Sequence, residues 1–391
     1  MHDRWMGEVR SLMQEEALDT TQRAYLWKII EEANKQSPEW YKAQCVPYLN
    51  SFAHHFEEEL AVFQERAELE RAFESAPFAA FGYRIKQESR PEDLVSRLEW
   101  FAGLRVVALD LSCLHLRDSD ILAASECESL AGLRSLNLSI NRIRDEGISA
   151  LGRSPHLCRL RHLKLCYNDF GAKGAKALVG STALEGLESL DLEWQPIGLS
   201  SLKALVDDLR HASLRRLNLS STKQGPKTPA LLAGAPSMQN LEHIDLSRNK
   251  IKSKGVVTLA ESGTLRKVRG LLLRACEITT EAIVALANSE GMRGLEELDC
   301  RWNQVDSNGA KALADSKLVT GLKRLDLSFN PIDDDGVRAL ARSPNMSSLQ
   351  ELCLAATHIT QRGVDAILAS EYLTQLKELD VRSNRDVLQQ R

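Results

Sequence analysis

Apolar positions recur along the chain at a fixed interval of 27 residues. The stretch at 133–143, LRSLNLSINRI, follows the pattern L-x-x-L-x-L-x-x-N-x-I, and nearly the same phrase returns at 160, 187, 241, 295 and 322. Its second apolar position falls at Leu109, Leu136, Leu163, Leu190, Leu217, Ile244, Leu271, Leu298, Leu325, Leu352 and Leu379. Such self-similarity is typical of a solenoid, in which each unit buries its apolar face against its neighbours.

Each unit divides into a strand half and a helix half. The core of the phrase alternates apolar and polar residues with period two, which predicts a short half-buried strand. The remaining residues, about sixteen per unit, predict a turn and a helix with an apolar stripe. A small residue near each helix start lets the helix approach its neighbour closely; it is Gly147, Gly174, Gly255, Gly309, Gly336 or Gly363, and once Ala282. The pattern therefore predicts eleven alternations of strand and helix, with all strands parallel.

From about residue 79 to the end, this pattern resembles the leucine-rich repeat proteins, specifically the strand-plus-helix type typified by ribonuclease inhibitor. The resemblance covers roughly four fifths of the chain. It implies an α/β fold, a right-handed horseshoe solenoid with a parallel β-sheet on the concave face and helices on the convex face. Residues 79–391 are thus predicted to form the solenoid.

The first residues differ from the repeats, and we predict a helical N-terminal cap domain over 1–78. Helical signals occur at 20–36, 37–44 and 52–75, where Thr or Ser caps and Pro38 open the first two segments. The layout is also similar to bacterial leucine-rich proteins with a short repeat-companion domain, the nearest match being YLWKIIEE at 25–32.

A degenerate capping repeat is predicted over about 79–103, between this domain and the first clear unit. PFAAFGYRIKQ at 77–87 predicts an irregular strand, and PEDLVSRLEWF at 91–101 predicts a helix. A terminal unit of a solenoid needs a polar outer face to cover the core.

The asparagine of the phrase has a structural explanation. Where the chain leaves each strand, backbone N–H and C=O groups lose water, and one amide side chain offers both donors and an acceptor to them. We call this set the Asn ladder: Asn141, Asn168, Asn249, Asn303, Asn330 and Asn384. Other units hold Leu114, Gln195, Thr222, Cys276 and Thr357 there. Leu114 satisfies no polar group, so irregular structure is expected near the first unit.

Composition narrows the classes of function. With 43% hydrophobic and only 5% aromatic residues the chain suits an aliphatic solenoid, and its net charge of −4 argues against a general nucleic-acid binder. The N-terminal stretch lacks a secretory pattern and no apolar run reaches membrane-helix length, so a cytoplasmic protein without a membrane partner is expected. The eight cysteines are scattered without a CxxC pair, which argues against a disulfide framework or zinc site.

Compact motifs for catalysis are absent from the sequence. GxxxxGK[ST], GxSxG and HExxH do not occur. HHFEEE at 54–59 places His and Glu one helical turn apart, and we interpret it as an exposed helix face. His162 and Cys166 lack further ligands in neighbouring units. No catalytic residue, metal or cofactor is therefore predicted.

The repeat register predicts which side chains line the concave face. Between the two strand leucines the column reads Asp110, Asn137, Lys164, Asp191, Asn218, Asp245, Leu272, Asp299, Asp326, Cys353 and Asp380. Strands lie about 4.8 Å apart, so Asp299 and Asp326 are expected to repel and the stripe to be largely acidic. The alternative is that each Asp is a solvated strand residue.

The next columns carry arginines and aromatic residues. They place Tyr167 beside Trp194, and Trp302 beside Phe329, on the rim of the strand face. Exposed aromatics next to Arg and Asp are typical of interaction hot spots, although packing on the next unit would also explain them. The predicted partner-binding set is Tyr167, Asp191, Glu193, Trp194, Asp245, Arg248, Arg274, Asp299, Arg301, Trp302, Asp326 and Phe329.

One unit breaks the pattern, with Pro226, Pro229 and Pro236 where its neighbours show an ordinary helix. Proline restricts regular structure there. A shortened helix and an irregular convex loop are expected, either as a docking point or as sequence drift.

These observations favour a non-catalytic scaffold or inhibitor that binds another protein, one with a basic surface, through the concave face. The ribonuclease-inhibitor resemblance implies inhibition or sequestration of a basic partner. The alternative is a regulator of a partner enzyme such as a GTPase-activating protein, since one branch of strand-plus-helix leucine-rich proteins has that role. The chain ends in DVRSNRDVLQQR, without the acidic tail of that branch.

Overall fold

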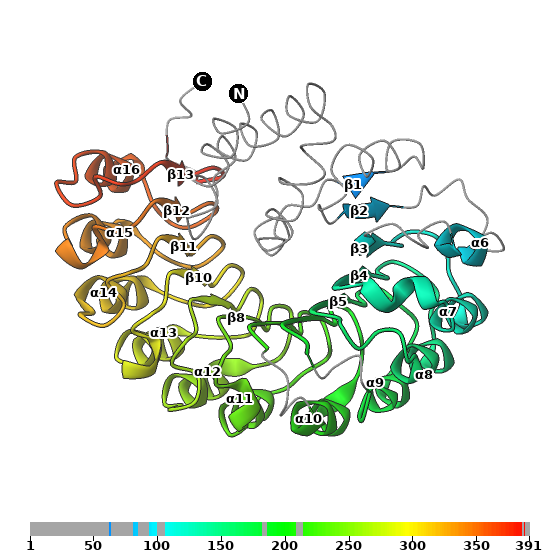
Figure 1. Cartoon of the computed structure of the whole chain (residues 1–391). Helices are drawn as coiled ribbons and strands as arrows, with labels where there is room; N and C mark the ends of the chain where they lie inside the picture. The colour runs from blue at the N-terminus through cyan, green and yellow to red at the C-terminus, as the bar shows by residue number, and fades with distance from the viewer. Residues whose placement is uncertain are drawn as a thin grey trace, which may run out of the picture.

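A single parallel sheet lines the inner side of a curved solenoid, and a layer of helices covers its outer side (Figure 1). The computed structural model describes residues 62–63, 81–84, 94–99, 106–181, 186–208, 214–384 and 387. The strands are β1 (Val62–Phe63), β2 (Phe81–Arg84), β3 (Val106–Asp110), β4 (Ser135–Asn137), β5 (His162–Lys164), β6 (Ser189–Asp191), β7 (Arg216–Asn218), β8 (His243–Asp245), β9 (Gly270–Leu272), β10 (Glu297–Asp299), β11 (Arg324–Asp326), β12 (Glu351–Cys353) and β13 (Glu378–Asp380).

The strands pair in the order of the sequence, each parallel to the next. From β3 to β13 the register follows the 27-residue interval: Leu109 pairs with Leu136, and Leu352 pairs with Leu379. Eleven parallel strands therefore hold equivalent residues side by side, as the sequence predicted.

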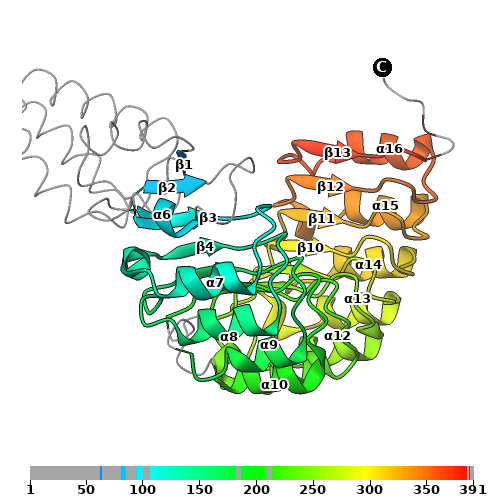
Figure 2. The same cartoon turned by 90° about the vertical axis from the view of Figure 1, so that its right-hand side faces the viewer.

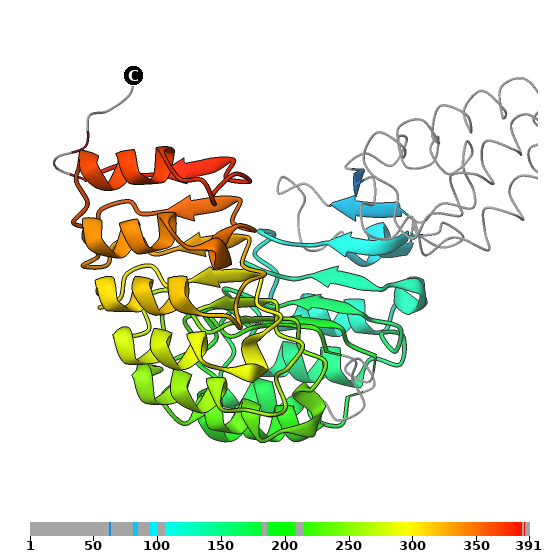
Figure 3. The ribbon, with the colours of Figure 1, turned by 90° about the vertical axis from the view of Figure 1, so that its left-hand side faces the viewer.

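The outer layer consists of one helix per unit, seen lengthwise in Figures 2 and 3. The helices are α6 (Leu94–Glu99), α7 (Asp118–Ser125), α8 (Asp145–Arg153), α9 (Ala172–Ala177), α10 (Gly198–Asp208), α11 (Thr228–Ala233), α12 (Lys252–Ala260), α13 (Thr280–Ala287), α14 (Ser307–Asp315), α15 (Asp334–Ala341) and α16 (Gln361–Leu368). Within the part of the chain that the structure describes, no helix is long and apolar enough to cross a bilayer.

The first elements agree in part with the sequence predictions. The strand expected at 77–87 is β2 and the helix expected at 91–101 is α6. The helix predicted over 52–75 is wrong at Val62–Phe63, which form β1 and pair with Gly82 and Tyr83. A β-branched and an aromatic residue suit a strand, and the open edge of β2 offers them backbone partners. The rest of the predicted 1–78 domain lies outside the described residues.

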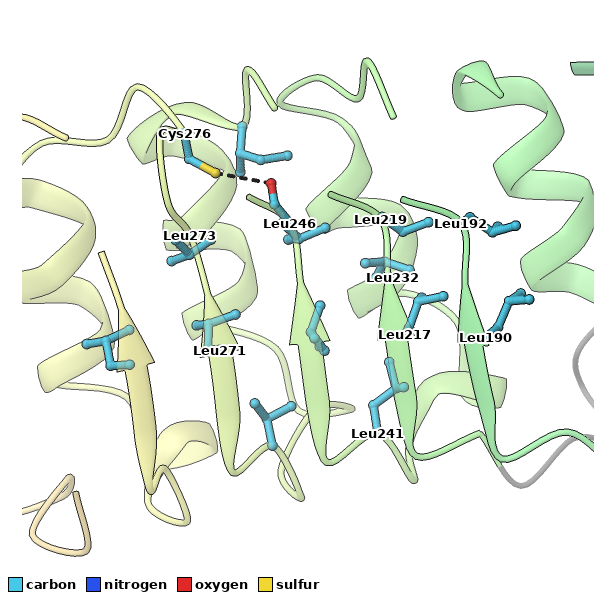
Figure 4. Close-up of a cluster of buried hydrophobic side chains, with 14 of the residues drawn as sticks. Leu190, Leu192, Leu217, Leu219, Leu232, Leu241, Leu246, Leu271, Leu273 and Cys276 are labelled. Atoms are coloured by element: carbon cyan, nitrogen blue, oxygen red, sulfur yellow. Dashed lines mark hydrogen bonds between the residues drawn. The ribbon is translucent and has the colours of Figure 1, made fainter. Parts of the chain in front are cut away.

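The core is a continuous apolar column between the two layers. In Figure 4 the leucines of successive strands lie in rows, with Leu232 of α11 packing onto them from the helix layer. Cys300 replaces one leucine of this column and is fully buried, as a small thiol can be.

The Asn ladder pairs the backbone of one unit with that of the next. Asn330 donates through Nδ2 to the carbonyl of Cys300 in the preceding unit, at 2.9 Å, and to that of Leu327 in its own. Its Oδ1 accepts the N–H of Val305 at 2.9 Å. Asn168, Asn249, Asn303 and Asn384 likewise donate to a carbonyl of the preceding unit. Each amide therefore bridges two repeats at the point where the strand ends.

The residues that replace these asparagines differ in whether their side chains donate a hydrogen bond to the preceding unit. Cys276 donates its thiol to the Leu246 carbonyl of the preceding unit (Figure 4). Burial raises the pKa of this thiol to about 12, so the donor proton stays in place at neutral pH. The single hydroxyl proton of Thr222 is donated to the Leu219 carbonyl within its own unit.

Leu114 donates no side-chain hydrogen bond, and its surroundings are irregular as expected. The register between β2 and β3 shifts at Phe81 and Gly82. The N–H groups of Leu114 and Leu116 nevertheless both donate to Asn141 Oδ1. The following unit thus satisfies the backbone that Leu114 cannot.

A second ladder, which the sequence analysis missed, lies on the convex side. A serine that follows one helix donates its hydroxyl to a carbonyl near the end of the preceding helix. The members are Ser154, Ser262, Ser289, Ser316, Ser343 and Ser370. Helix ends leave carbonyls without intrahelical partners, so this ladder satisfies buried groups of the outer layer.

The regular spacing of glycine from one helix to the next reflects close packing. A Cβ atom at Gly336 would lie 3.0 Å from the Cα of Ser307 in the preceding helix and 3.0 Å from Cγ2 of Ile332. We expect Gly336→Val to lower the free energy of unfolding by about 1–3 kcal/mol through overpacking. Urea unfolding followed by circular dichroism measures this. Gly171→Val is the control, because nothing lies within 4 Å of its Cβ position; equal effects of the two changes would contradict the packing argument.

Removal of a ladder amide should cost more than removal of an exposed one. Asn330→Ala leaves the Cys300 carbonyl and the Val305 N–H without their side-chain partner, and we expect a loss of about 2–4 kcal/mol. The matched change is Asn288→Ala, whose exposed amide donates only to Val284 of its own helix. A loss below 1 kcal/mol (roughly the value of one ordinary hydrogen bond) for Asn330→Ala in urea titrations would refute a bridging role.

Candidate functional site

One position in each of the eleven units has left-handed backbone, and we call these residues the rim column. They directly precede the ladder position, with φ between 49° and 63°: Cys113, Ile140, Tyr167, Trp194, Ser221, Arg248, Ala275, Trp302, Phe329, Ala356 and Ser383. Left-handed backbone costs an L-residue with a Cβ about 1–2 kcal/mol, and glycine or asparagine relieves that cost. None of the eleven units has glycine or asparagine at this position. Each unit therefore bears the conformational cost, and each presents a larger side chain just after the end of its strand.

Two pairs of aromatic side chains stack on this column. The ring centroids of Tyr167 and Trp194 lie 5.2 Å apart at 28°, and those of Trp302 and Phe329 lie 3.9 Å apart at 10°. Their relative exposures are 45%, 43%, 52% and 37% in chain order. The register therefore predicted both neighbours correctly, and the rings remain open to solvent.

Ile140 extends the first pair by one unit and was missed in the sequence analysis. It occupies the rim column next to Tyr167 with 52% of its surface exposed. A β-branched residue is especially unfavourable in left-handed backbone. The 27-residue register was the signal that could have identified it.

The aspartates of the strand column hold the backbone as well as facing solvent. Oδ1 of Asp191 accepts the N–H of Glu193 at 3.0 Å, and Oδ1 of Asp245 accepts that of Ser247 at 2.8 Å. Asn137, Asn218, Asp326 and Asp380 make the same bond two residues onward. The side chain thus fixes the turn that leads into the rim column.

Two units without this carboxylate or amide receive a substitute from the preceding unit. With Leu272 in the column, the N–H of Arg274 donates to Ser247 Oγ at 3.2 Å. With Cys353 there, the N–H of Ala355 donates to Ser328 Oγ at 3.1 Å. The same backbone group is satisfied in both cases, so the turn is maintained.

The predicted repulsion between Asp299 and Asp326 is present but reduced by Arg301, which lies between them: burial is the largest cause that raises the pKa of Asp326, and Asp299 raises it further. Its Nη2 is 2.6 Å from Asp299 Oδ2 and its Nε is 3.2 Å from Asp326 Oδ2. Asp299 is only 6% exposed. One arginine offsets only one of the two carboxylates, so the three side chains keep one net negative charge and this end of the stripe is less acidic than predicted.

Three further acidic residues, Asp191, Glu193 and Asp245, lie toward the middle of the sheet, and we call them the central acidic cluster. Among the described residues none of the three forms an ion pair. Burial is the largest cause that raises the pKa of each carboxyl. Asp191 and Asp245 further raise the pKa of Glu193 by repulsion, against a lowering effect of Arg248. The cluster is a concentration of incompletely compensated negative charge.

The two remaining arginines of the predicted set occupy different environments. Arg248 is exposed on the rim column, two units from Trp194. Arg274 is half-buried, and its backbone N–H is held by Ser247. Arg248 is thus the more accessible of the two.

The proline-containing unit has a short helix, as predicted. α11 has six residues, with Pro229 tolerated in its first turn. Lys223 and Gln224, which precede it, line a pocket beside Trp194 and Arg248. The segment that leads from the strand to α11 therefore contributes to the rim, and the irregular convex loop stays a prediction.

The described residues contain no group of three His, Cys, Asp or Glu side chains that could hold a metal ion. His54, His55, Glu58 and Glu59 lie outside the described residues. Burial lowers the pKa of His162, and the Cys166 thiol donates to Ser139 Oγ at 2.8 Å.

Comparison with known proteins identifies the repeats. A family model described as Leucine Rich repeat matches residues 133–152, 156–179, 237–260, 293–314 and 321–341, so the chain contains leucine-rich repeats. No curated protein sequence matches the chain.

Several solved structures are similar to this chain. An internalin (inlF) from Listeria monocytogenes has 18% identity and a TM-score of 0.42, over 76% of this chain and 89% of that one. A chain of the Rad7 and Elc1 complex in yeast has 15% identity and a TM-score of 0.48, over 93% and 98%. A chain of the TLR13-ssRNA13 complex has 18% identity and a TM-score of 0.42, over 85% and 45%.

Neutralising one member of the central acidic cluster should stabilise the protein. Asp245→Asn keeps the oxygen that accepts the Ser247 N–H and removes a half-buried charge. Because folding raises the pKa of this carboxyl, the wild type gains stability as the pH falls through that pKa and loses it as the pH rises. We expect Asp245→Asn to add about 0.5–2 kcal/mol at pH 7, with the gain shrinking toward pH 4. Urea unfolding at both pH values measures it.

The control for this change is Asp207→Asn, whose exposed carboxylate pairs with Lys203 on α10. It should alter stability by no more than about 0.5 kcal/mol. A loss of stability for Asp245→Asn at pH 7, or a gain independent of pH, would contradict the burial argument.

Proposed function

We propose that this leucine-rich repeat chain is a non-catalytic scaffold that binds a partner protein through the rim column and the concave face. The observation that carries the proposal is the pair of exposed aromatic stacks, Tyr167 with Trp194 and Trp302 with Phe329. Tryptophan and tyrosine are enriched among the residues that dominate binding energy at protein interfaces.

The energetics of these four side chains are better explained by a role in binding than by a role in stabilising the fold. Each occupies left-handed backbone, at a cost of about 1–2 kcal/mol. Stacking returns about 0.5–1.5 kcal/mol per pair, and the rings stay largely in water. Glycine or asparagine would be more stable at these positions, so the aromatic rings are better explained by a partner that covers them.

The central acidic cluster supplies a charge preference. Asp191 and Glu193 share the unit of Trp194, and Asp245 lies two units further on, between the two aromatic pairs, which are separated by four strand spacings, or about 19 Å. Opposite charge across an interface accelerates association and fixes orientation. The proposed partner accordingly carries a basic surface that faces Asp191, Glu193 and Asp245.

The finer classification is part of this proposal. One helix in every unit supports the strand-plus-helix, ribonuclease-inhibitor-like type of repeat, and with it inhibition or sequestration as the mode of action. A regulator of a partner enzyme, such as a GTPase-activating protein, stays a hypothesis without a specific observation in its favour. The cytoplasmic location and the companion-domain origin also stay predictions.

The test replaces the second aromatic pair without weakening the fold. Trp302→Asn/Phe329→Asn places a residue that tolerates left-handed backbone at both positions, so the variant should unfold at the same urea concentration as the wild type or higher. Capture of partner proteins from host lysate, quantified by mass spectrometry, should fall at least tenfold for a protein that the wild type enriches.

The matched control is Ala356→Asn/Ser383→Asn, the same change in the next two units of the rim column. It should leave capture unchanged. Equal capture by the wild type and by the Trp302/Phe329 variant, with both folded, would refute binding through this pair. Loss in both variants would show that the rim column acts through backbone geometry and not through its aromatic rings.

A further inference from the structure

The rim column contains a gap at Ser221. Trp194 stands one unit before this small residue and Arg248 one unit after it, so two strand spacings, about 10 Å, separate their positions. A pocket of about 620 Å³ opens there. Its lining consists of Trp194, Pro196, Ser221, Lys223, Gln224, Arg248, Asn249 and Lys250.

Tyr167 covers Trp194 from the preceding unit and is not part of the pocket lining. Trp194 therefore presents apolar ring surface to the pocket, while stacking with Tyr167 holds its ring in position. A supported indole is a platform on which a flat or apolar group can stack.

The wall opposite this platform is held in place by Gln224, which is only 3% exposed. Its backbone N–H donates to Asn249 Oδ1 at 2.9 Å, and its carbonyl accepts the N–H of Lys250 at 3.1 Å. Its side chain donates to the Thr222 carbonyl at 3.2 Å and accepts from Thr228 Oγ1 at 2.9 Å. The loop of the proline-containing unit is thus fixed before any ligand arrives, which lowers the entropy cost of binding.

The charge of the pocket is positive. Lys223, Arg248 and Lys250 line it, and no acidic residue does. Lys250 lies 3.9 Å from Glu277, an exposed and weakly coupled pair. The buried Ser221 hydroxyl has no hydrogen-bond partner among the described residues and is available as a donor.

Lys223 is itself held in left-handed backbone, with φ of 59°. The preceding Thr222 stands where most units carry a ladder asparagine. The same combination occurs at His115 after Leu114 and at Glu277 after Cys276. Three of the five units without a ladder asparagine thus have this second left-handed residue, and in the unit of Thr222 it brings a lysine to the pocket.

We propose that this pocket binds a segment of the partner protein in which a negatively charged group, carboxylate or phosphate, adjoins an aromatic or other flat apolar group. The flat group stacks on Trp194, and the anion accepts hydrogen bonds from Lys223, Arg248 and Ser221. This inference rests on the proposed function and adds the chemistry that the partner must present.

A protein segment fits better than a nucleic acid. Binding a nucleic-acid backbone needs a track of cations that neutralises successive phosphates. Here the central acidic cluster of Asp191, Glu193 and Asp245 lies on the strands next to the pocket and would repel such a backbone. A protein segment can instead place one anionic group in the cationic pocket and basic side chains over the central acidic cluster. Both charged regions of the surface are then complemented.

The first experiment uses small probes on the full chain. N-acetyl-phenylalanine, which joins a ring to a carboxylate, is titrated by ligand-observed NMR beside its neutral analogue N-acetyl-phenylalaninamide. We expect the acid to bind at least tenfold more tightly than the amide. Phenyl phosphate is the third probe: tighter binding of it than of the acid assigns the anion to phosphate, and weaker binding assigns it to carboxylate. Equal binding of acid and amide would overturn the proposal.

Variants locate the binding on the protein. Lys223→Gln/Arg248→Gln should weaken the acid at least tenfold, whereas Lys173→Gln/Lys176→Gln, two exposed lysines of α9, should not change it. Unfolding in urea confirms that both variants are folded. Unchanged affinity in the Lys223/Arg248 variant would refute the site.

Two further outcomes separate this inference from the proposed function. If Lys223→Gln/Arg248→Gln still captures a partner that Trp302→Asn/Phe329→Asn loses, the anion pocket is wrong and the scaffold stands. If a single-stranded oligonucleotide binds more tightly than the acid and is lost in the Lys223/Arg248 variant, the pocket serves nucleic acid and the proposal of a protein segment fails.

Discussion

The solenoid depends on one constraint: backbone groups at the ends of its strands are buried between repeats and must be hydrogen-bonded there. A ladder asparagine meets this demand by donating to a carbonyl of the preceding unit and accepting an N–H from that unit as well, as Asn330 does with Cys300 and Val305. Apolar burial supplies most of the stabilisation, but it has no direction. The amide bridges set the register, and the register places equivalent side chains side by side along the sheet.

The candidate surface is a consequence of that register. Because each strand ends in the same turn, every unit presents one left-handed residue at the rim. The turn is reinforced by the aspartate or asparagine of the strand column, or by a serine of the neighbouring unit where that residue is missing. A single backbone geometry therefore displays eleven variable positions, and function is set by which residues occupy them. Two aromatic pairs, a half-buried acidic cluster and a cationic pocket are thus all arranged around one repeated turn.

Much of this could be predicted from the sequence, because a strict repeat turns sequence spacing into spatial neighbours. The stacked partners of Tyr167 and Trp302 followed from the interval of 27 residues alone. The directions of side chains could not be predicted from this interval. The sequence analysis treated the charge of Asp299 as uncompensated, whereas Arg301, two residues onward, folds back and donates to it. The pocket at Ser221 was missed for a related reason, since Lys223 and Lys250 line it from the segments that follow their strands, and the repeat spacing does not predict the path of these segments. At Val62–Phe63 the sequence pattern predicted a helix, but these residues pair with the open edge of β2 and form a strand instead.

The amide bridge is incomplete at two successive repeats of the proposed binding region. Thr222 donates its only hydroxyl proton within its own repeat, and Oε1 of Gln195, one repeat earlier, is buried without a hydrogen-bond partner among the described residues. Elsewhere in the ladder, Cys276 and Thr357 each stand between two asparagines, whereas Gln195 and Thr222 are adjacent. The pocket beside Trp194 and Ser221 therefore coincides with the longest run of repeats without a ladder asparagine, where fewer side-chain hydrogen bonds join one repeat to the next.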